Sequence, residues 1–107
     1  MKFVITDDQL KKLKLKLYQF KIKFLNSYVT SGTIRKFDSF IVIEDPSVDN
    51  DFEEPHMEYD SYDGRLFVNK EIRNSFIAMF NGDREETDNF IKHWFEDKFH
   101  VDVKFLA

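Results

Sequence analysis

The chain has 107 residues, a length that suits one domain able to bury a core without disulfides or metals. Its 13 Phe, four Tyr and one Trp exclude a disordered chain of the low-hydrophobicity, high-charge kind, and the absence of Cys excludes disulfides, thiolate metal sites and cysteine nucleophiles. The net charge of −4 conceals two opposite blocks: residues 9–28 hold six lysines and no acid, whereas residues 44–63 hold nine acids and no Lys or Arg. We therefore expect a single cytoplasmic domain, residues 1–107, whose charge polarity concerns its partners rather than its fold.

The N-terminal residues predict a short strand followed by a helix. Residues 2–5 are typical of a strand, and Thr6-Asp7-Asp8-Gln9 has the S/T-x-x-E/Q form of a capping box at a helix start. The apolar stretch is short and is closed by two acids, without the h-region and cleavage site of a secretion signal. No run approaches the roughly 18 apolar residues that a membrane span requires, so we expect no span.

Residues 9–28 carry apolar side chains in two stripes. The main stripe follows the three- and four-residue spacing of one helix face and is expected to pack on the core: Leu10, Leu13, Leu17, Phe20, Phe24 and Tyr28. A second, narrower stripe lies opposite: Leu15, Tyr18, Ile22 and Leu25. Alternation of apolar residues with lysine also fits two strands. It slips at Tyr18-Gln19, however, and the capping box and the helix-forming Leu, Lys and Gln favour a helix.

Turn signals divide the middle of the chain into strands and a loop. Residues 37–44 are rich in β-branched and aromatic side chains and predict a buried or half-buried strand, which Pro46 closes. The polar, acidic residues 45–55 predict an exposed loop. Residues 56–60 and 65–68 flank Asp63-Gly64, a tight-turn signal, and therefore predict a hairpin.

Two helices and a strand are expected to complete the fold. Asn69 is placed to cap a helix over residues 70–80, which Asn81-Gly82 would end, and Asp83 is placed to cap a last helix. Val101, Val103 and Phe105 alternate as in a terminal strand. The predicted order is β-α-β-β-β-α-α-β, an α+β fold with a small, mostly antiparallel sheet covered by one long and two shorter helices.

Known catalytic and metal-binding patterns are missing, so we predict no enzyme, no cofactor and no metal site. Asp49, Asp51 and Glu53 alternate like the first ligands of a calcium loop, and Asp60 falls at its twelfth position. Glu54 stands where such a loop needs Gly, however, so we expect a solvated loop instead. The three histidines lack zinc-ligand spacing: His56, His93 and His100. The three glycines lie far apart, which excludes a glycine-rich phosphate loop.

The lysine-rich segment is the candidate binding site. If it is helical, its second stripe must be covered either by the protein's own fold or by a partner. We predict an interaction module that binds another protein, or a second copy of itself, through seven residues: Lys12, Leu15, Lys16, Tyr18, Ile22, Lys23 and Leu25. One alternative is salt-sensitive nucleic-acid binding by the lysines, and another is a surface helix whose lysines are solvated or paired with the acidic loop: Lys11, Lys12, Lys14, Lys16, Lys21 and Lys23.

Three stretches resemble short uncharacterised proteins of bacteriophages and marine viruses. They are the opening MKFVIT with Asp7-Asp8-Gln9-Leu10, the hairpin end GRLFV, and residues 86–101 with Ile91, Trp94-Phe95 and Phe99. The resemblance spans the first ten residues and residues 63–103. It implies a viral origin and an accessory or virion role, in the host cytoplasm or the virion, and it transfers no functional residue.

Overall fold

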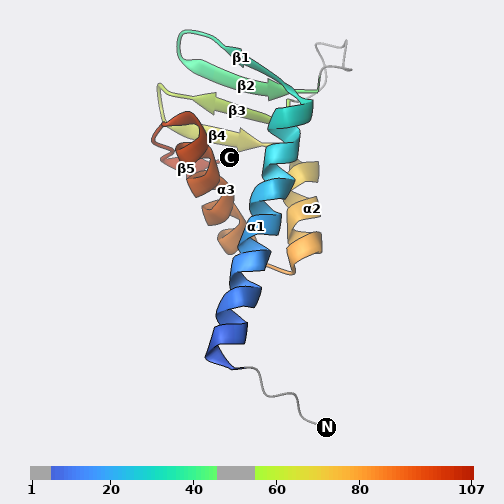
Figure 1. The fold of residues 1–107 in the computed structure, drawn as a ribbon. Coiled ribbons are helices and arrows are strands. Elements are labelled where there is room, and N and C mark those ends of the chain that lie inside the picture. The colour runs from blue at the N-terminus through green and yellow to red at the C-terminus, as the bar shows by residue number, and fades with distance from the viewer. Residues whose placement is uncertain (1–5, 46–54) are drawn as a thin grey trace.

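The computed structural model describes residues 6–45 and 55–107 and confirms an α+β fold (Figure 1). Three helices and a five-stranded, mostly antiparallel sheet make up the described part of the chain. The elements in order are α1 (Asp7–Ser31), β1 (Thr33–Lys36), β2 (Phe40–Glu44), β3 (Met57–Asp60), β4 (Arg65–Val68), α2 (Lys70–Phe80), α3 (Arg84–Phe99) and β5 (Phe105–Leu106). The strand predicted at residues 2–5 and most of the predicted acidic loop lie outside the described residues.

The lysine-rich segment forms a single helix, so the interpretation as two strands is wrong. The predicted capping box starts α1, because the Gln9 amide donates to the Thr6 hydroxyl at 3.3 Å and the Thr6 amide donates to Gln9 Oε1 at 3.1 Å. The helix then runs for 25 residues and ends at Ser31, with Gly32 as its C-cap. A Cβ at Gly32 would lie 2.3 Å from the Tyr28 carbonyl oxygen, so only glycine fits where the chain turns into β1.

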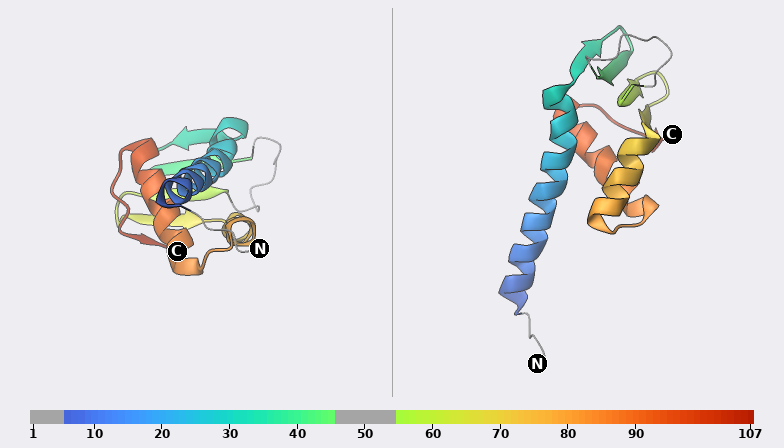
Figure 2. Two further views of the ribbon diagram at one scale, coloured as in Figure 1. Left: turned by 60° about the horizontal axis from the view of Figure 1, so that its bottom comes forward. Right: turned by 90° about the vertical axis from the view of Figure 1, so that its right-hand side faces the viewer.

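The sheet presents apolar side chains to the helices on one face. Strand order is β1-β2-β3-β4-β5, with antiparallel neighbours except for β5, which is parallel to β4. The strand registers align two apolar rows across β2, β3 and β4 on this face: Ile41, Tyr59 and Leu66, and Ile43, Met57 and Val68. All three helices lie on this side of the sheet (Figures 1 and 2).

The strand predictions are partly confirmed. The hairpin is β3 and β4, but the strand predicted at residues 37–44 begins only at Phe40, and β1 was not expected. The terminal strand is limited to Phe105 and Leu106. Val103 is buried as expected, yet its amide donates to Glu96 Oε2 at 3.0 Å and not to a neighbouring strand. The Glu96 carboxylate therefore takes the place of a carbonyl acceptor on a neighbouring strand at Val103.

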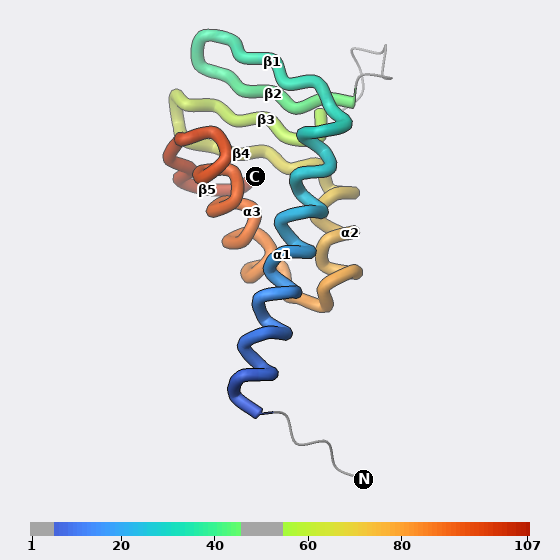
Figure 3. Tube along the Cα trace, viewed as in Figure 1, coloured from blue at the N-terminus to red at the C-terminus, as the bar shows by residue number. Residues whose placement is uncertain are grey.

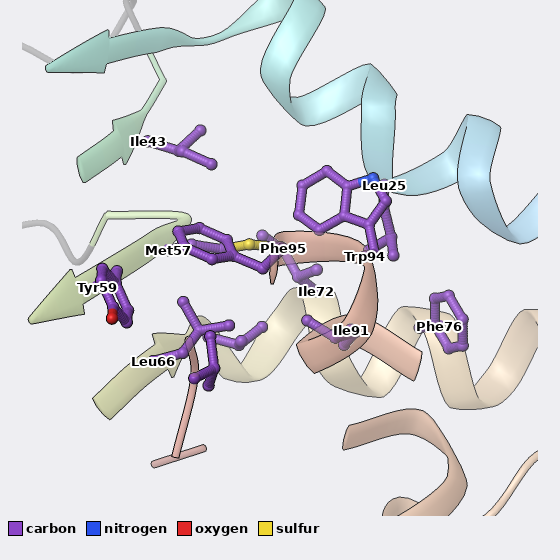
Figure 4. Close-up of a cluster of buried hydrophobic side chains, with 12 residues drawn as sticks. Leu25, Ile43, Met57, Tyr59, Leu66, Ile72, Phe76, Ile91, Trp94 and Phe95 are labelled. Atoms are coloured by element: carbon purple, nitrogen blue, oxygen red, sulfur yellow. The ribbon is translucent and has the colours of Figure 1, made fainter. Parts of the chain in front are cut away.

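The core lies between the sheet on one side and, on the other, helices α2 and α3 together with the second half of α1 (Figure 4). Leu25 of α1 has no exposed surface and joins a cluster drawn from β2, β3, β4, α2 and α3. Phe24 packs on α2, with ring centroids 5.9 Å from Phe76 and 6.0 Å from Phe80. On the other side, Trp94 of α3 donates its indole N–H to Asn26 Oδ1 at 2.9 Å. The second half of α1 is thus held between α2 and α3.

The first half of α1 extends beyond the other helices. The described chain measures 56 × 28 × 21 Å, and its long dimension follows α1, whose N-terminal end lies clear of α2 and α3 (Figures 2 and 3). Each residue from 6 to 20 is exposed. The expectation that the whole main stripe packs on the core is therefore wrong for its first four residues. The reason is length, since α1 has 25 residues and α2, which covers the stripe, has 11.

Candidate functional site

Residues 7–20 of α1, here named the projecting segment, are the candidate site. At 1.5 Å per residue this segment is about 21 Å long. No described element beyond α1 covers it along most of that length (Figure 2). It begins at the capping box, with Asp7 and Asp8 in the first turn, where acids complement the helix dipole.

Large apolar side chains are exposed along the projecting segment. Leu13 is 53% exposed and Phe20 is 60% exposed, values that would be ordinary for one isolated residue. Here six such side chains occur within eleven consecutive positions: Leu10, Leu13, Leu15, Leu17, Tyr18 and Phe20. Four belong to the main stripe and two to the second stripe. The main stripe therefore exposes apolar side chains along the whole projecting segment, which is unusual for a surface that remains in water.

The lysines of α1 differ in their surroundings. Lys21, where α1 enters the space between α2 and α3, places its ammonium group over three aromatic rings, 5.3 Å from the centroid of Phe90 and about as close to Phe76 and Phe80. The other five are exposed: Lys11, Lys12, Lys14, Lys16 and Lys23. Among residues 6–45 and 55–107, no ion pair joins a lysine of α1 to an acid.

The acidic residues near the sheet do not neutralise the projecting segment. Glu44 pairs with Arg35 across β1 and β2, and Glu58 and Asp60 lie on β3. The predicted pairing of the lysines with the acidic loop involves mainly residues 46–54, and these residues lie outside the described part of the chain. Within the described part, the segment carries a net positive surface beyond its first turn.

The seven predicted partner-binding residues do not form one exposed surface. Five are exposed as expected: Lys12, Leu15, Lys16, Tyr18 and Lys23. Ile22 is half-buried against the core, and Leu25 is fully buried, so the assignment of Leu25 to a partner surface is corrected. The physical reason is that α3 lies beside the second stripe, with Tyr18 and Phe90 ring centroids 5.6 Å apart, and the core covers this stripe only at Ile22 and Leu25.

The sequence interpretation missed four residues of the site: Leu10, Leu13, Leu17 and Phe20. They share the spacing of Phe24, which is half-buried, and spacing alone does not distinguish the two ends of one stripe. The length of the stripe could have shown that part of it would remain uncovered. A stripe reaching from residue 10 to residue 28 is longer than the predicted helix of residues 70–80 that packs on it.

A groove of about 460 Å³ separates α1 from α3 beside the projecting segment. Its floor and walls combine apolar and polar side chains: Tyr18, Ile22, Asn26, Phe90, His93, Trp94, Asp97 and Lys98. Within the described chain, no hydrogen bond or ion pair joins two of its titratable side chains to each other. His93 instead contacts Glu96 at 3.4 Å and is largely exposed.

Other kinds of site are not assembled in the part of the chain that the structure describes. Residues 6–45 and 55–107 contain no group of three or more His, Asp or Glu side chains arranged to hold a metal ion. His56 packs against Tyr28, far in sequence from the two histidines of the C-terminal quarter. The acids that resemble a calcium loop fall mostly on residues 46–54, outside the description. None of the described helices is apolar enough over sufficient length to cross a membrane.

Comparisons with known proteins give no relative from which a role could be transferred. No protein-family model, curated protein or solved structure matches the chain.

Proposed function

We propose that this protein is a non-enzymatic interaction module that binds another protein through the projecting segment. One observation carries the proposal: six large apolar side chains remain exposed on a helix segment that the protein's own core does not use. Burying them against a partner would be favourable by about 25 cal/mol of free energy for each Å² of apolar surface removed from water. A folded chain that only needed α1 for its core could begin the helix near residue 20.

The chemistry of the segment favours a protein over a smaller ligand. Its apolar surface is convex and extends along about 21 Å of helix, whereas sites for small molecules are concave. Amphipathic helices with anchors at three- and four-residue spacing are a common means of protein recognition. The viral accessory or virion role implied by the sequence resemblance is compatible with such a module and belongs to this proposal.

Capture from cells of the source organism, with matched variants, tests the proposal. The wild-type chain is compared with the double variant Leu13→Gln, Leu17→Gln and with Tyr62→Ala, which removes a 92% exposed ring from the β3–β4 turn. We expect the wild type and Tyr62→Ala to retain the same proteins and the double variant to lose them. Equal recovery by all three folded chains would refute the projecting segment as the binding surface.

Nucleic-acid binding is the second candidate, because five lysines of α1 are exposed and lack described acidic partners. It accounts for the charge but leaves the exposed leucines unexplained. If it holds, affinity for duplex DNA or RNA falls steeply as salt rises, and Lys12→Glu with Lys16→Glu weakens binding. Under the protein-docking proposal, neither nucleic acid binds appreciably at physiological salt.

A further inference from the structure

The main stripe has the spacing of a two-helix coiled-coil seam along the projecting segment. Leu10, Leu13, Leu17, Phe20 and Phe24 follow one another at intervals of three, four, three and four residues. These are the a and d positions of successive heptads, which form the contact line between two supercoiled helices. Leu10, Leu13, Leu17 and Phe20 are each at least 42% exposed, whereas Phe24, the next a position, is half-buried.

The covered end of this stripe shows what kind of element fits it. Phe24 packs on α2, an 11-residue helix whose last residue, Phe80, lies 6.0 Å from the Phe24 ring. Beyond Phe80 the chain turns at Asn81, which adopts a left-handed conformation, and α2 ends. The rest of the stripe therefore continues past the end of a helix that already packs on it. A second helix placed end to end with α2 would cover the remainder.

The positions that flank the seam select the charge of that second helix. With Leu10 at position a, the e and g positions of the heptads 10–16 and 17–23 are all lysine: Lys14, Lys16, Lys21 and Lys23. Side chains at e and g face those of the partner helix and determine which helices pair. A second copy of α1 would oppose lysine with lysine in a parallel pair, and like charges at these positions disfavour pairing. Glutamates at the same positions would form ion pairs instead.

We infer that the projecting segment binds an acidic amphipathic helix of another protein, which packs along the main stripe beyond α2 and pairs its flanking carboxylates with Lys14 and Lys16. This inference rests on the proposed function and names the partner's chemistry. Lys21 contributes less, because its ammonium group already lies over the rings of α2 and α3.

Two synthetic peptides test the inference with the full chain. Both are amphipathic helices with Leu at a and d; one has Glu at e and g, and the matched control has Lys there. Fluorescence anisotropy of the labelled peptides measures binding at low and high salt. We expect the acidic peptide to bind and the basic peptide to bind at least about tenfold more weakly, with the difference reduced at high salt.

Three variants separate the seam from its alternatives. Leu13→Gln with Leu17→Gln is expected to weaken binding of the acidic peptide by about tenfold or more, because two half-exposed leucines lose their burial. Tyr62→Ala, which removes an exposed ring from the β3–β4 turn, is expected to leave the affinity nearly unchanged. Lys14→Glu with Lys16→Glu is expected to reverse the preference, so that the basic peptide binds better. Trp94 fluorescence confirms that each variant is folded.

The outcomes distinguish this inference from the proposed function. If the charge-reversed variant does not change its preference, or if Tyr62→Ala weakens binding as much as the Leu13 and Leu17 changes, the acidic-helix inference is overturned. Sedimentation that shows a dimer broken by Leu13→Gln would make a second copy the occupant, which overturns the inference but leaves protein docking intact. Binding of duplex DNA that is unaffected by the leucine changes would overturn both.

Discussion

Leu13 and Leu25 form a matched pair that separates the two halves of α1. Both are leucines of the same helix, but Leu13 is 53% exposed and Leu25 has no exposed surface. Leu25→Ala removes buried carbon atoms and leaves a cavity in the cluster that joins the helices to the sheet, a change that costs about 2 to 5 kcal/mol. Leu13→Ala removes atoms that are half in water, and alanine is an excellent helix former, so we expect a change within about 0.5 kcal/mol.

Urea unfolding followed by the fluorescence of Trp94, the single tryptophan, measures both variants. The indole is 5% exposed and contacts α1 through Asn26, so its signal reports separation of α1 from α3. The measurement is repeated at two protein concentrations, because self-association through the projecting segment would make the stability concentration-dependent. If Leu13→Ala destabilises the chain as much as Leu25→Ala does, the projecting segment is part of the fold and the reasoning fails.

Three further predictions concern the body of the fold. The buried Arg73 guanidinium lies 2.9 Å from the Asp88 carboxylate, and Asp88→Ala removes this acidic partner. We expect the free energy of unfolding, measured by urea titration, to fall by about 2 kcal/mol or more, and no loss would contradict a stabilising ion pair. Burial raises the pKa of Tyr59, and the nearby Asp102 carboxylate raises it further, so the folded state favours the neutral phenol. The contribution of Tyr59 to stability is complete below pH of about 10, the pKa of an unfolded tyrosine, and is lost as the pH rises through the pKa of the folded state. In urea unfolding at a series of alkaline pH values, the free energy of unfolding should therefore decline less for Tyr59→Phe than for the wild type. Parallel declines would contradict this. Gly64→Ala places a Cβ on a residue whose φ is 73°, and this Cβ would lie 2.7 Å from the Lys104 side chain. We expect the substitution to lower the free energy of unfolding by about 1 to 2 kcal/mol, measured by thermal unfolding, and an unchanged Tm would argue against a strained turn.

Helix limits were predictable because their signals are local. The side chains of Thr6, Asn69 and Asp83 each accept from a backbone amide two or three residues further on, as their residue types indicate. Asn81 ends α2 in the left-handed conformation that asparagine tolerates. Each of these features depends on a few neighbouring residues, which a sequence displays directly.

Features that depend on distant parts of the chain were not predictable in the same way. β1 has no buried residue, so Thr33–Lys36 shows no alternating apolar pattern, and only its pairing with β2 makes it a strand. The exposure of Leu13 and the burial of Leu25 depend on where α2 and α3 end in space. Helical spacing identified both residues as members of apolar stripes but did not show which stripe, or which half of it, the core would cover.

Hydrogen exchange along α1 measures whether the projecting segment is held in place by the rest of the protein. In the free chain, we expect amides of residues 7–20 to exchange much faster than those of residues 21–31, which α2 and α3 hold in place. Addition of the acidic peptide should slow exchange in residues 7–20 and leave the sheet unchanged. Strong protection of residues 7–20 in the free monomer, or no change when the peptide is added, would contradict a docking role for this segment.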